Sequence, residues 1–547
     1  MLENKIIKDH INTLWNAMWR AGFGNSLLAI EQITFLFFIK TIEDLDRRNL
    51  FFAEDSNGSI FSGTYIPYID EKLYIAEGGT FKYEETQALQ QQLIEDKKPR
   101  TKNELRWSYF KQMEPEEMLK HIKFNVYPFI LSLNSNYLKS SDKSNAVLMI
   151  ENPAVLNEVT LLIDLIFEEL DVDNLNSKDF NTGDIFESVL SQIVISGNSG
   201  QIRTPRHIIK LIVELLEPSL GQKIADPACG TGGFLIGANS HIVHKLSISD
   251  DKENAIVDFD KFYSISLSAQ TTKKHQENLS NSLKGFDLDI HMVRISLMNL
   301  MMHGINNPLV TYKDSLSQNL LKDELFDMVM SNPPFSGTID KGNIDRNLKL
   351  QTNRVPLLFL ERIYNMLKKN GTAAIIVPHN TLFNTTKAFV EIRKKIVEEA
   401  QLIAVLSLPK GVFRPTASVQ TAILIFKKGN ATKKTWFYHI KDDGFTLDDK
   451  RLPKYFSDGS RDYGDLNDVI LRFKNRDKNN DNDRSSQCFF VDKKDLREAN
   501  YNLDFQKYKD VLAEEFEFQS FKDIFNELEK NELKIQKEIS ELKGLLL

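Results

Sequence analysis

The chain has 547 residues, of which 41% are hydrophobic and 27% are charged, and its formal net charge is −7. This length predicts about two to four domains with a substantial core, and the composition excludes a disordered or fibrous protein. The acidic balance disfavours a chain that grips nucleic acid alone, because phosphate contacts favour a basic face. A partner subunit would then supply much of any such grip.

The two cysteines, Cys229 and Cys488, are far apart and lack metal-ligand spacing, so the sequence predicts neither a disulfide framework nor a metal site. Residues 1–5 show no signal-peptide pattern, and the early apolar run 33–39 is too short to cross a bilayer. We therefore expect a cytoplasmic protein without a membrane anchor.

The first 170 residues are predicted to form a helical domain. Apolar residues recur at helical spacing between residues 14 and 40, and again over 115–133 and 153–170. No combination of catalytic residue types occurs in this region.

Residues 171–430 are predicted to form an α/β domain, because short apolar strands alternate with helical patterns. The expected strands are 223–225, 283–286, 309–312, 326–331, 372–378, 402–408 and 421–427. The expected helices are 207–216, 290–302, 356–368 and 386–399. This alternation predicts a mostly parallel, doubly wound sheet. The last two strands are expected to form an antiparallel pair at its edge.

Residues 431–510 are predicted to be a peripheral region, and their polar stretch 474–487 has the composition of a linker. Residues 511–547 are predicted to form an amphipathic helix, because apolar residues recur at steps of four and three and are interrupted once, at Glu532. This helix either packs on its own domain or binds a partner.

A glycine-rich loop follows the strand 223–225. Asp226 ends that strand, and Gly230, Thr231, Gly232 and Gly233 follow. Glycines let a ligand approach the backbone closely. The loop matches neither GxGxxG nor GxxxxGK[ST] and has no lysine for a β/γ-phosphate, which disfavours an NTPase. It suits a nucleoside that bears an amino acid, with Asp226 near a positively charged ligand group.

Acidic residues end the next two strands. Asp287 is placed to accept the ribose hydroxyls of a nucleoside, as the second-strand acid does in dinucleotide folds; Asp289 also qualifies, but its position is less favourable. Asp314 follows the strand 309–312 and is a candidate for contact with an adenine amino group. The polar stretch 247–260, which precedes Asp287, is interpreted as a surface insertion.

Asn332, Pro333, Pro334 and Phe335 leave the carboxyl end of the strand 326–331, where open α/β sheets bind ligands. The asparagine offers both an acceptor and a donor, and the prolines remove donors and stiffen the turn. Such a motif can hold a planar exocyclic amine while the Phe335 ring stacks on the ring that bears it.

These motifs resemble the modification (M) subunits of type I restriction-modification systems, which are N6-adenine DNA methyltransferases that use S-adenosylmethionine (SAM). The resemblance covers most of the chain and rests on GQIRTPR (200–206), DPACGTGGFL (226–235), NPPF (332–335), IVPHN with LF (376–383), LPKGVF (408–413) and DGFTLDDKR (443–451). It implies a Rossmann-like SAM-dependent methyltransferase domain between a helical N-terminal domain and a helical C-terminal segment.

The resemblance also assigns residues and partners. The SAM site would be lined by Gln201, Ile202, Arg203, Thr204, Pro205, Arg206, Thr231, Gly232, Gly233 and Asp287. Asn332 to Phe335 would hold an adenine flipped out of double-stranded DNA. Two M subunits would work with one specificity (S) subunit, and a restriction (R) subunit would join them.

The chain departs from the family pattern at Ile202-Arg203, where an aromatic pair is usual, and at Asp287, where glutamate is common. These departures leave open a SAM-binding scaffold subunit without turnover. A second alternative is a SAM-dependent methyltransferase that acts on RNA or on a protein glutamine, because motifs like NPPF also serve those planar nitrogens.

Overall fold

The computed structural model describes residues 5–24, 26–47, 59–66, 98–133, 148–174, 186–187, 190, 204–247, 257–260, 262, 273–305, 307–317, 325–476, 481–510, 529, 531–532 and 535–536. Gln201, Ile202 and Arg203 lie outside this set, and so does nearly all of the helix expected over 511–547. No helix within these ranges is long and apolar enough to cross a membrane.

The N-terminal region is helical, as predicted, and its phenylalanines fill its core. Phe35, Phe37 and Phe38 are each about 1% exposed or less and pack with apolar residues of the neighbouring helices. The helices are α1 (Lys5–Arg20), α2 (Ser26–Arg47), α5 (Trp107–Phe110), α6 (Pro115–His121), α7 (Tyr127–Ser132) and α8 (Pro153–Asn174). A 3-10 turn (Lys102–Leu105), a π-helical turn (Ile122–Val126) and the short strands β1 (Thr64–Tyr65) and β2 (Arg100–Thr101) complete it.

The α/β region contains a nine-stranded sheet of order β13-β10-β8-β9-β7-β6-β3-β4-β5. Its strands are β3 (Ile224–Asp226), β4 (Leu283–Asp287), β5 (Leu309–Tyr312), β6 (Phe326–Ser331), β7 (Leu367–Pro378), β8 (Ala400–Ser407), β9 (Thr421–Lys428), β10 (Lys434–His439) and β13 (Cys488–Asp492). The run from β7 to β5 is parallel throughout, so the segments after β3, β4 and β6 all leave the same edge.

The other half of the sheet differs from the prediction. β8 and β9 are antiparallel, as expected, but they do not form its edge. β9 is also antiparallel to β7, while β10 pairs in parallel with β8 and is followed by β13. The α/β domain was predicted to end at residue 430, because the residues that follow contain a long polar stretch. This stretch lies between the segments that form β10 and β13. Trp436 and Phe437 of β10 and Phe489 and Val491 of β13 are nonetheless fully buried.

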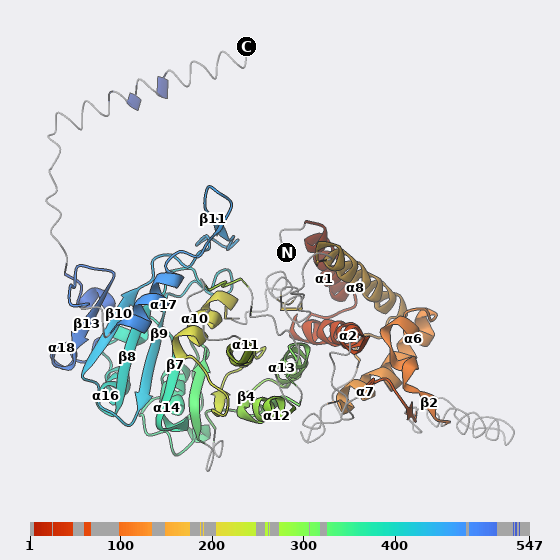
Figure 1. Ribbon diagram of the computed structural model, residues 1–547, viewed down its shortest axis with the longest axis horizontal. Helices are drawn as coiled ribbons and strands as arrows, with labels where there is room; N and C mark the ends of the chain where they lie inside the picture. Colours follow the sequence, from red (N-terminus) through yellow and green to blue (C-terminus); the bar gives the residue numbers. More distant parts are fainter. Residues whose placement is uncertain are drawn as a thin grey trace.

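Helices cover both faces of the sheet (Figure 1). One face packs against α10 (Arg206–Leu216), α11 (Gly233–Ser247), α13 (Ile290–Met302) and α17 (Leu466–Asn475). The other packs against α14 (Val355–Met366), α16 (Lys387–Glu398) and α18 (Lys493–Glu498). The remaining elements are α12 (Lys273–Ser282), α15 (Asn380–Phe383), β11 (Lys454–Tyr455), β12 (Arg461–Asp462) and the 3-10 turns Lys341–Asn343 and Phe505–Lys507.

α13 joins the two regions. Its methionines Met292, Met298 and Met302 belong to the same apolar core as α1, α2 and α8, and Figure 1 shows it beside the red α2. Glu31 of α2 is 1% exposed and accepts hydrogen bonds from Arg294 Nη1 at 2.9 Å and from His291 Nδ1 at 2.5 Å. The helical region is therefore fixed to a helix that begins three residues after Asp287.

Candidate active site

Asn332 follows β6 directly and makes one side-chain hydrogen bond. Its amide Nδ2 donates to Thr204 Oγ1 at 2.9 Å. Its carbonyl oxygen Oδ1 is buried and has no partner among the described residues. A buried acceptor without a partner is costly, so this oxygen marks a place where a hydrogen-bond donor is missing.

Phe335 is half-buried beside this asparagine's turn. Its ring packs at 79° to that of Phe413, with 5.1 Å between the ring centroids. Phe413 is 3% exposed and belongs to the LPKGVF segment. Pro333 is buried and Pro334 is exposed. The NPPF segment is thus held by a buried proline and a perpendicular ring contact.

The glycine loop lies between β3 and α11. Gly230 and Gly232 have φ of +52° and +83°, a backbone region that glycine adopts without strain. A Cβ on Gly232 would lie 2.7 Å from Ser296 Oγ of α13, and one on Gly233 would lie 2.6 Å from Ile209 Cδ1 of α10. The loop backbone is therefore packed closely between two helices.

Asp287 supports this loop from the end of β4. Its Oδ2 accepts a hydrogen bond from Gly230 N at 2.9 Å, and its Oδ1 accepts one from Asp289 N at 2.9 Å. Burial raises the pKa of this carboxyl even though these amides stabilise its ionised form. An ionised carboxylate has about four acceptor sites, so two remain for a ligand.

Asp226 is 1% exposed and its carboxylate faces protein atoms. Oδ1 accepts hydrogen bonds from Ser331 Oγ at 2.7 Å and from Ala228 N at 3.0 Å. Burial raises the pKa of Asp226 to about 7, despite these two donors. The contact joins the start of the glycine loop to the strand that ends before Asn332.

Arg206 is directed toward protein groups. Its Nη2 lies 2.9 Å from Glu187 Oε2, its Nη1 donates to Asp260 O at 3.1 Å, and Glu187 is 1% exposed. Asn299 Nδ2 donates to Thr231 O at 2.9 Å and lies 3.4 Å from the other Glu187 oxygen. Arg206 thus takes part in a network that holds the glycine loop.

Pro205 and Asp314 occupy supporting positions. The Pro205 carbonyl accepts from Ile208 N and Ile209 N and so starts α10. Asp314 Oδ1 accepts from Leu316 N at 2.9 Å. The adjacent Ser315 Oγ donates to Pro227 O at 2.5 Å, which ties this turn to the loop after β3.

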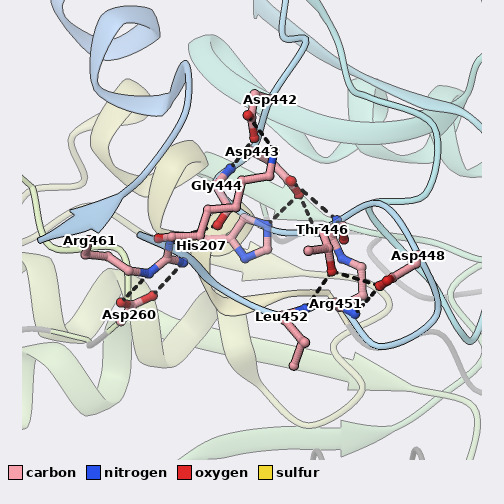
Figure 2. Close-up of polar contacts among 11 residues, drawn as sticks. His207, Asp260, Asp442, Asp443, Gly444, Thr446, Asp448, Arg451, Leu452 and Arg461 are labelled. Carbon is pink, nitrogen blue, oxygen red and sulfur yellow. Dashed lines mark hydrogen bonds and ion pairs between the residues drawn. The ribbon is translucent and has the colours of Figure 1, made fainter. Parts of the chain in front are cut away.

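Figure 2 shows a polar cluster around Asp443, whose side chain is fully buried. Asp443 Oδ2 accepts from His207 Nε2 at 3.0 Å and pairs with the Arg451 guanidinium. The His207 ring stacks on Phe445 with 4.5 Å between centroids. Arg461 lies over the Phe445 ring at 4.6 Å and binds Asp260 Oδ2 at 2.9 Å. The DGFTLDDKR segment is therefore packed against the start of α10.

Sequence reasoning missed several of these supporting groups. They are Ser331, which binds Asp226, and Asn299, which binds Thr231 and Glu187. A single sequence gives no sign of these contacts, because the partners are far apart in the chain. Residues 257–260, expected on the surface, contribute Phe259, which is 1% exposed. Asp258 and Asp260 are exposed, as expected, and they bind Tyr463 and Arg461, while the Phe259 ring packs against that of Tyr463.

A parallel sheet with a glycine loop after β3, an acid at the end of β4 and NPPF after β6 defines a Rossmann-like methyltransferase domain. Two family models match the chain: N-6 DNA Methylase over residues 177–517 and HsdM N-terminal domain over residues 7–165. The chain belongs to the N-6 DNA methylase family, and its organisation is that of the modification subunits of type I restriction-modification systems.

Curated relatives include the type I restriction enzyme EcoEI methylase subunit of Escherichia coli, which is 32% identical over 345 residues, or 61% of this chain and 64% of that protein. The StySPI methylase subunit of Salmonella potsdam is 28% identical, over 61% of this chain and 62% of its own. The matched parts thus span less than two thirds of these relatives.

Solved structures support the fold. A chain from a structure on complex assembly and conformational transition of the type I R-M system covers 98% of both chains, with a TM-score of 0.57 and 23% identity. The type I methyltransferase subunit from Streptococcus thermophilus covers 91% of this chain and 100% of its own, with a TM-score of 0.54 and 17% identity. At 17% and 23% identity, these two comparisons show a similar fold and nothing further.

Proposed function

We propose that this chain is the methylation subunit of a type I restriction-modification complex. It transfers a methyl group from SAM to N6 of adenine in double-stranded DNA, at a site chosen by a specificity subunit. The observation that carries the proposal is Asn332 Oδ1, which is buried and has no partner among the described residues. Asn332 follows β6, and β6 pairs with β3, the strand that precedes the glycine loop.

On the base side, Asn332 Oδ1 accepts a hydrogen bond from the exocyclic amine of adenine. A second acceptor is a backbone carbonyl of the prolyl segment. Together they draw the amine nitrogen away from planarity and expose its lone pair, so that alignment and electrostatic stabilisation suffice for reaction. Phe335 stacks on the base, which must leave the duplex to reach this site.

On the cofactor side, bound SAM supplies an electrophilic methyl group. Gly230, Gly232 and Gly233 have no side chains to obstruct it, and with Thr231 they form the loop proposed to contact it. Asp287 accepts hydrogen bonds from the backbone amides of Gly230 and Asp289, and a carboxylate with about four acceptor sites keeps lone pairs for ribose hydroxyls. The remaining proposed cofactor contacts are Gln201, Ile202, Arg203, Thr204, Pro205, Arg206, Asp226 and Asp314.

Partners follow from the same proposal. The net charge of −7 favours a complex in which a specificity subunit supplies much of the DNA contact. Two M subunits would bind one S subunit, a restriction subunit would join them, and the complex would act in the cytoplasm.

Transfer of tritiated methyl groups from SAM to DNA, by the full chain with its specificity subunit, tests the proposal. Asn332→Ala should lower the rate by at least about 10²-fold, while SAM still binds. Asn475→Ala, at the exposed end of α17, is the matched control and should leave the rate unchanged. Transfer that survives Asn332→Ala would contradict the role of this residue; methylation of RNA or protein instead of DNA would contradict the substrate.

A further inference from the structure

We propose that the Thr204 hydroxyl is a positioning group that holds the Asn332 side chain where its amide meets the target amine. The inference rests on the proposed function, because it concerns the asparagine assigned to that amine. By resemblance, the segment that contains Thr204 lines the SAM site. The threonine hydroxyl itself contacts the asparagine of the NPPF motif.

The two ends of an asparagine amide have opposite hydrogen-bonding character: Oδ1 only accepts and Nδ2 only donates. Thr204 Oγ1 lies 2.9 Å from Nδ2 and can accept from it. This contact leaves Oδ1 as the free end, buried and unpartnered in the described part of the chain. A rotation of the amide by 180° would place the NH₂ group against the amine of adenine, donor facing donor.

Without Thr204 neither end of this amide would have a hydrogen-bond partner among the described residues, and the side chain would be free to turn toward other groups. A hydroxyl can accept or donate, so the target amine, which needs an acceptor, selects the end of the amide that faces the base. The threonine hydroxyl binds the other end and so keeps the Asn332 side chain in place.

Thr204 is itself held firmly, which is what a positioning group requires. Three successive residues after it are anchored: the Pro205 carbonyl accepts two backbone amides, Arg206 pairs with Glu187, and His207 binds Asp443. The chain next to Thr204 is therefore held by contacts with the helix it precedes, with Glu187 and with the DGFTLDDKR segment.

The test uses the full chain with its specificity subunit and compares Thr204→Val with Thr204→Ser. Valine keeps the shape and removes the acceptor, whereas serine keeps the hydroxyl. Thr204→Val should lower kcat for methyl transfer by between about tenfold and a hundredfold. The SAM dissociation constant, measured by equilibrium binding without DNA, should stay within about twofold. Thr204→Ser should recover most of the lost rate.

Thr160→Val is the matched control. This threonine is 2% exposed in α8, and its hydroxyl donates to Leu156 O within the same helix, so kcat should not change. If Thr204→Val unfolds, Thr204→Ala removes the same acceptor without adding a methyl group to the site and is expected to give the same loss.

Three outcomes would overturn the inference. If the wild-type complex is active and Thr204→Val has the same kcat, the inference about Thr204 is overturned and the proposed function is not. A loss of SAM affinity as large as the loss of rate would make the Thr204 hydroxyl a cofactor ligand and not a positioning group for Asn332. A wild-type complex that transfers no methyl group to adenine would overturn the proposed function, and this inference with it.

Discussion

His207 Nε2 donates a hydrogen bond of 3.0 Å to Asp443 Oδ2, although 236 residues separate them in the chain. Burial lowers the pKa of His207, against the raising effect of the hydrogen bond with Asp443, and so favours the neutral ring. Burial alone would raise the pKa of Asp443, but the hydrogen bond from His207 and the charge of Arg451 lower it to about 2. Asp443 is therefore a buried carboxylate whose partners lie at the start of α10 and in its own segment.

Asp443→Asn should lower the free energy of unfolding by about 3–5 kcal/mol, because it removes the buried carboxylate that pairs with the Arg451 guanidinium, whose side chain is only 11% exposed. Urea denaturation of the full chain measures this change. Asp449→Asn is the control: that side chain is 75% exposed and pairs with Arg414 at the surface, where ion pairs contribute little. Equal effects of the two substitutions would contradict the buried-pair interpretation.

Gly232→Ala should weaken SAM binding and destabilise the fold. Its φ of +83° disfavours any side chain, and its Cβ would lie 2.7 Å from Ser296 Oγ. Gly459→Ala is a matched control, because Gly459 has the same φ of +83° and nothing within 4 Å of a built Cβ. Equilibrium SAM binding should fall at least about tenfold for Gly232→Ala and not for Gly459→Ala. Similar affinities would show that the loop has room for a side chain.

Phe413→Leu should raise the KM for DNA by about threefold to tenfold, because a perpendicular aromatic pair is worth about 0.5–1.5 kcal/mol beyond burial. The substitution removes the ring that packs on Phe335 at 5.1 Å. SAM affinity should be retained, and fluorescence of a 2-aminopurine placed at the target base should report weaker binding of the extruded base. A normal KM with a reduced SAM affinity would assign Phe413 to the cofactor site instead.

His291 should make the contact between α2 and α13 pH-dependent. The hydrogen bond with Glu31 raises its pKa, against the opposing effect of burial. A raised pKa in the folded state means that the stabilisation is complete below the unfolded value of about 6.5 and is lost as pH rises through the folded value. The difference in unfolding free energy between wild type and His291→Gln should therefore be largest at low pH and shrink as pH rises.

Glu31→Gln serves as the second variant for this contact. It should remove the same pH-dependent part of the unfolding free energy, since the carboxylate that raises the His291 pKa is gone. It should also add a pH-independent loss, because Arg294 is 4% exposed and loses its buried partner. A pH-independent difference for His291→Gln would show that the His291–Glu31 contact does not couple stability to protonation.

Much of the fold could be read from local pattern. β6 (Phe326–Ser331) and α13 (Ile290–Met302) have the bounds expected from the sequence, because a buried strand and a buried helix need unbroken or periodic apolar side chains. The sheet edge was placed wrongly, since β10 joins β8 and not its sequence neighbour β9. Pairing between distant segments leaves no mark in a single sequence.

The sequence by itself determined the chemistry at the edge of the sheet: a glycine loop, an acid at the end of β4 and a stiff asparagine turn after β6. These are encoded within a few residues each, because backbone conformation and strand ends are local properties. Only the tertiary structure decided which groups hold them. Thr204 meets Asn332, Ser331 meets Asp226 and His207 meets Asp443, and these contacts form because burial requires each polar group to find a partner, wherever in the chain that partner lies.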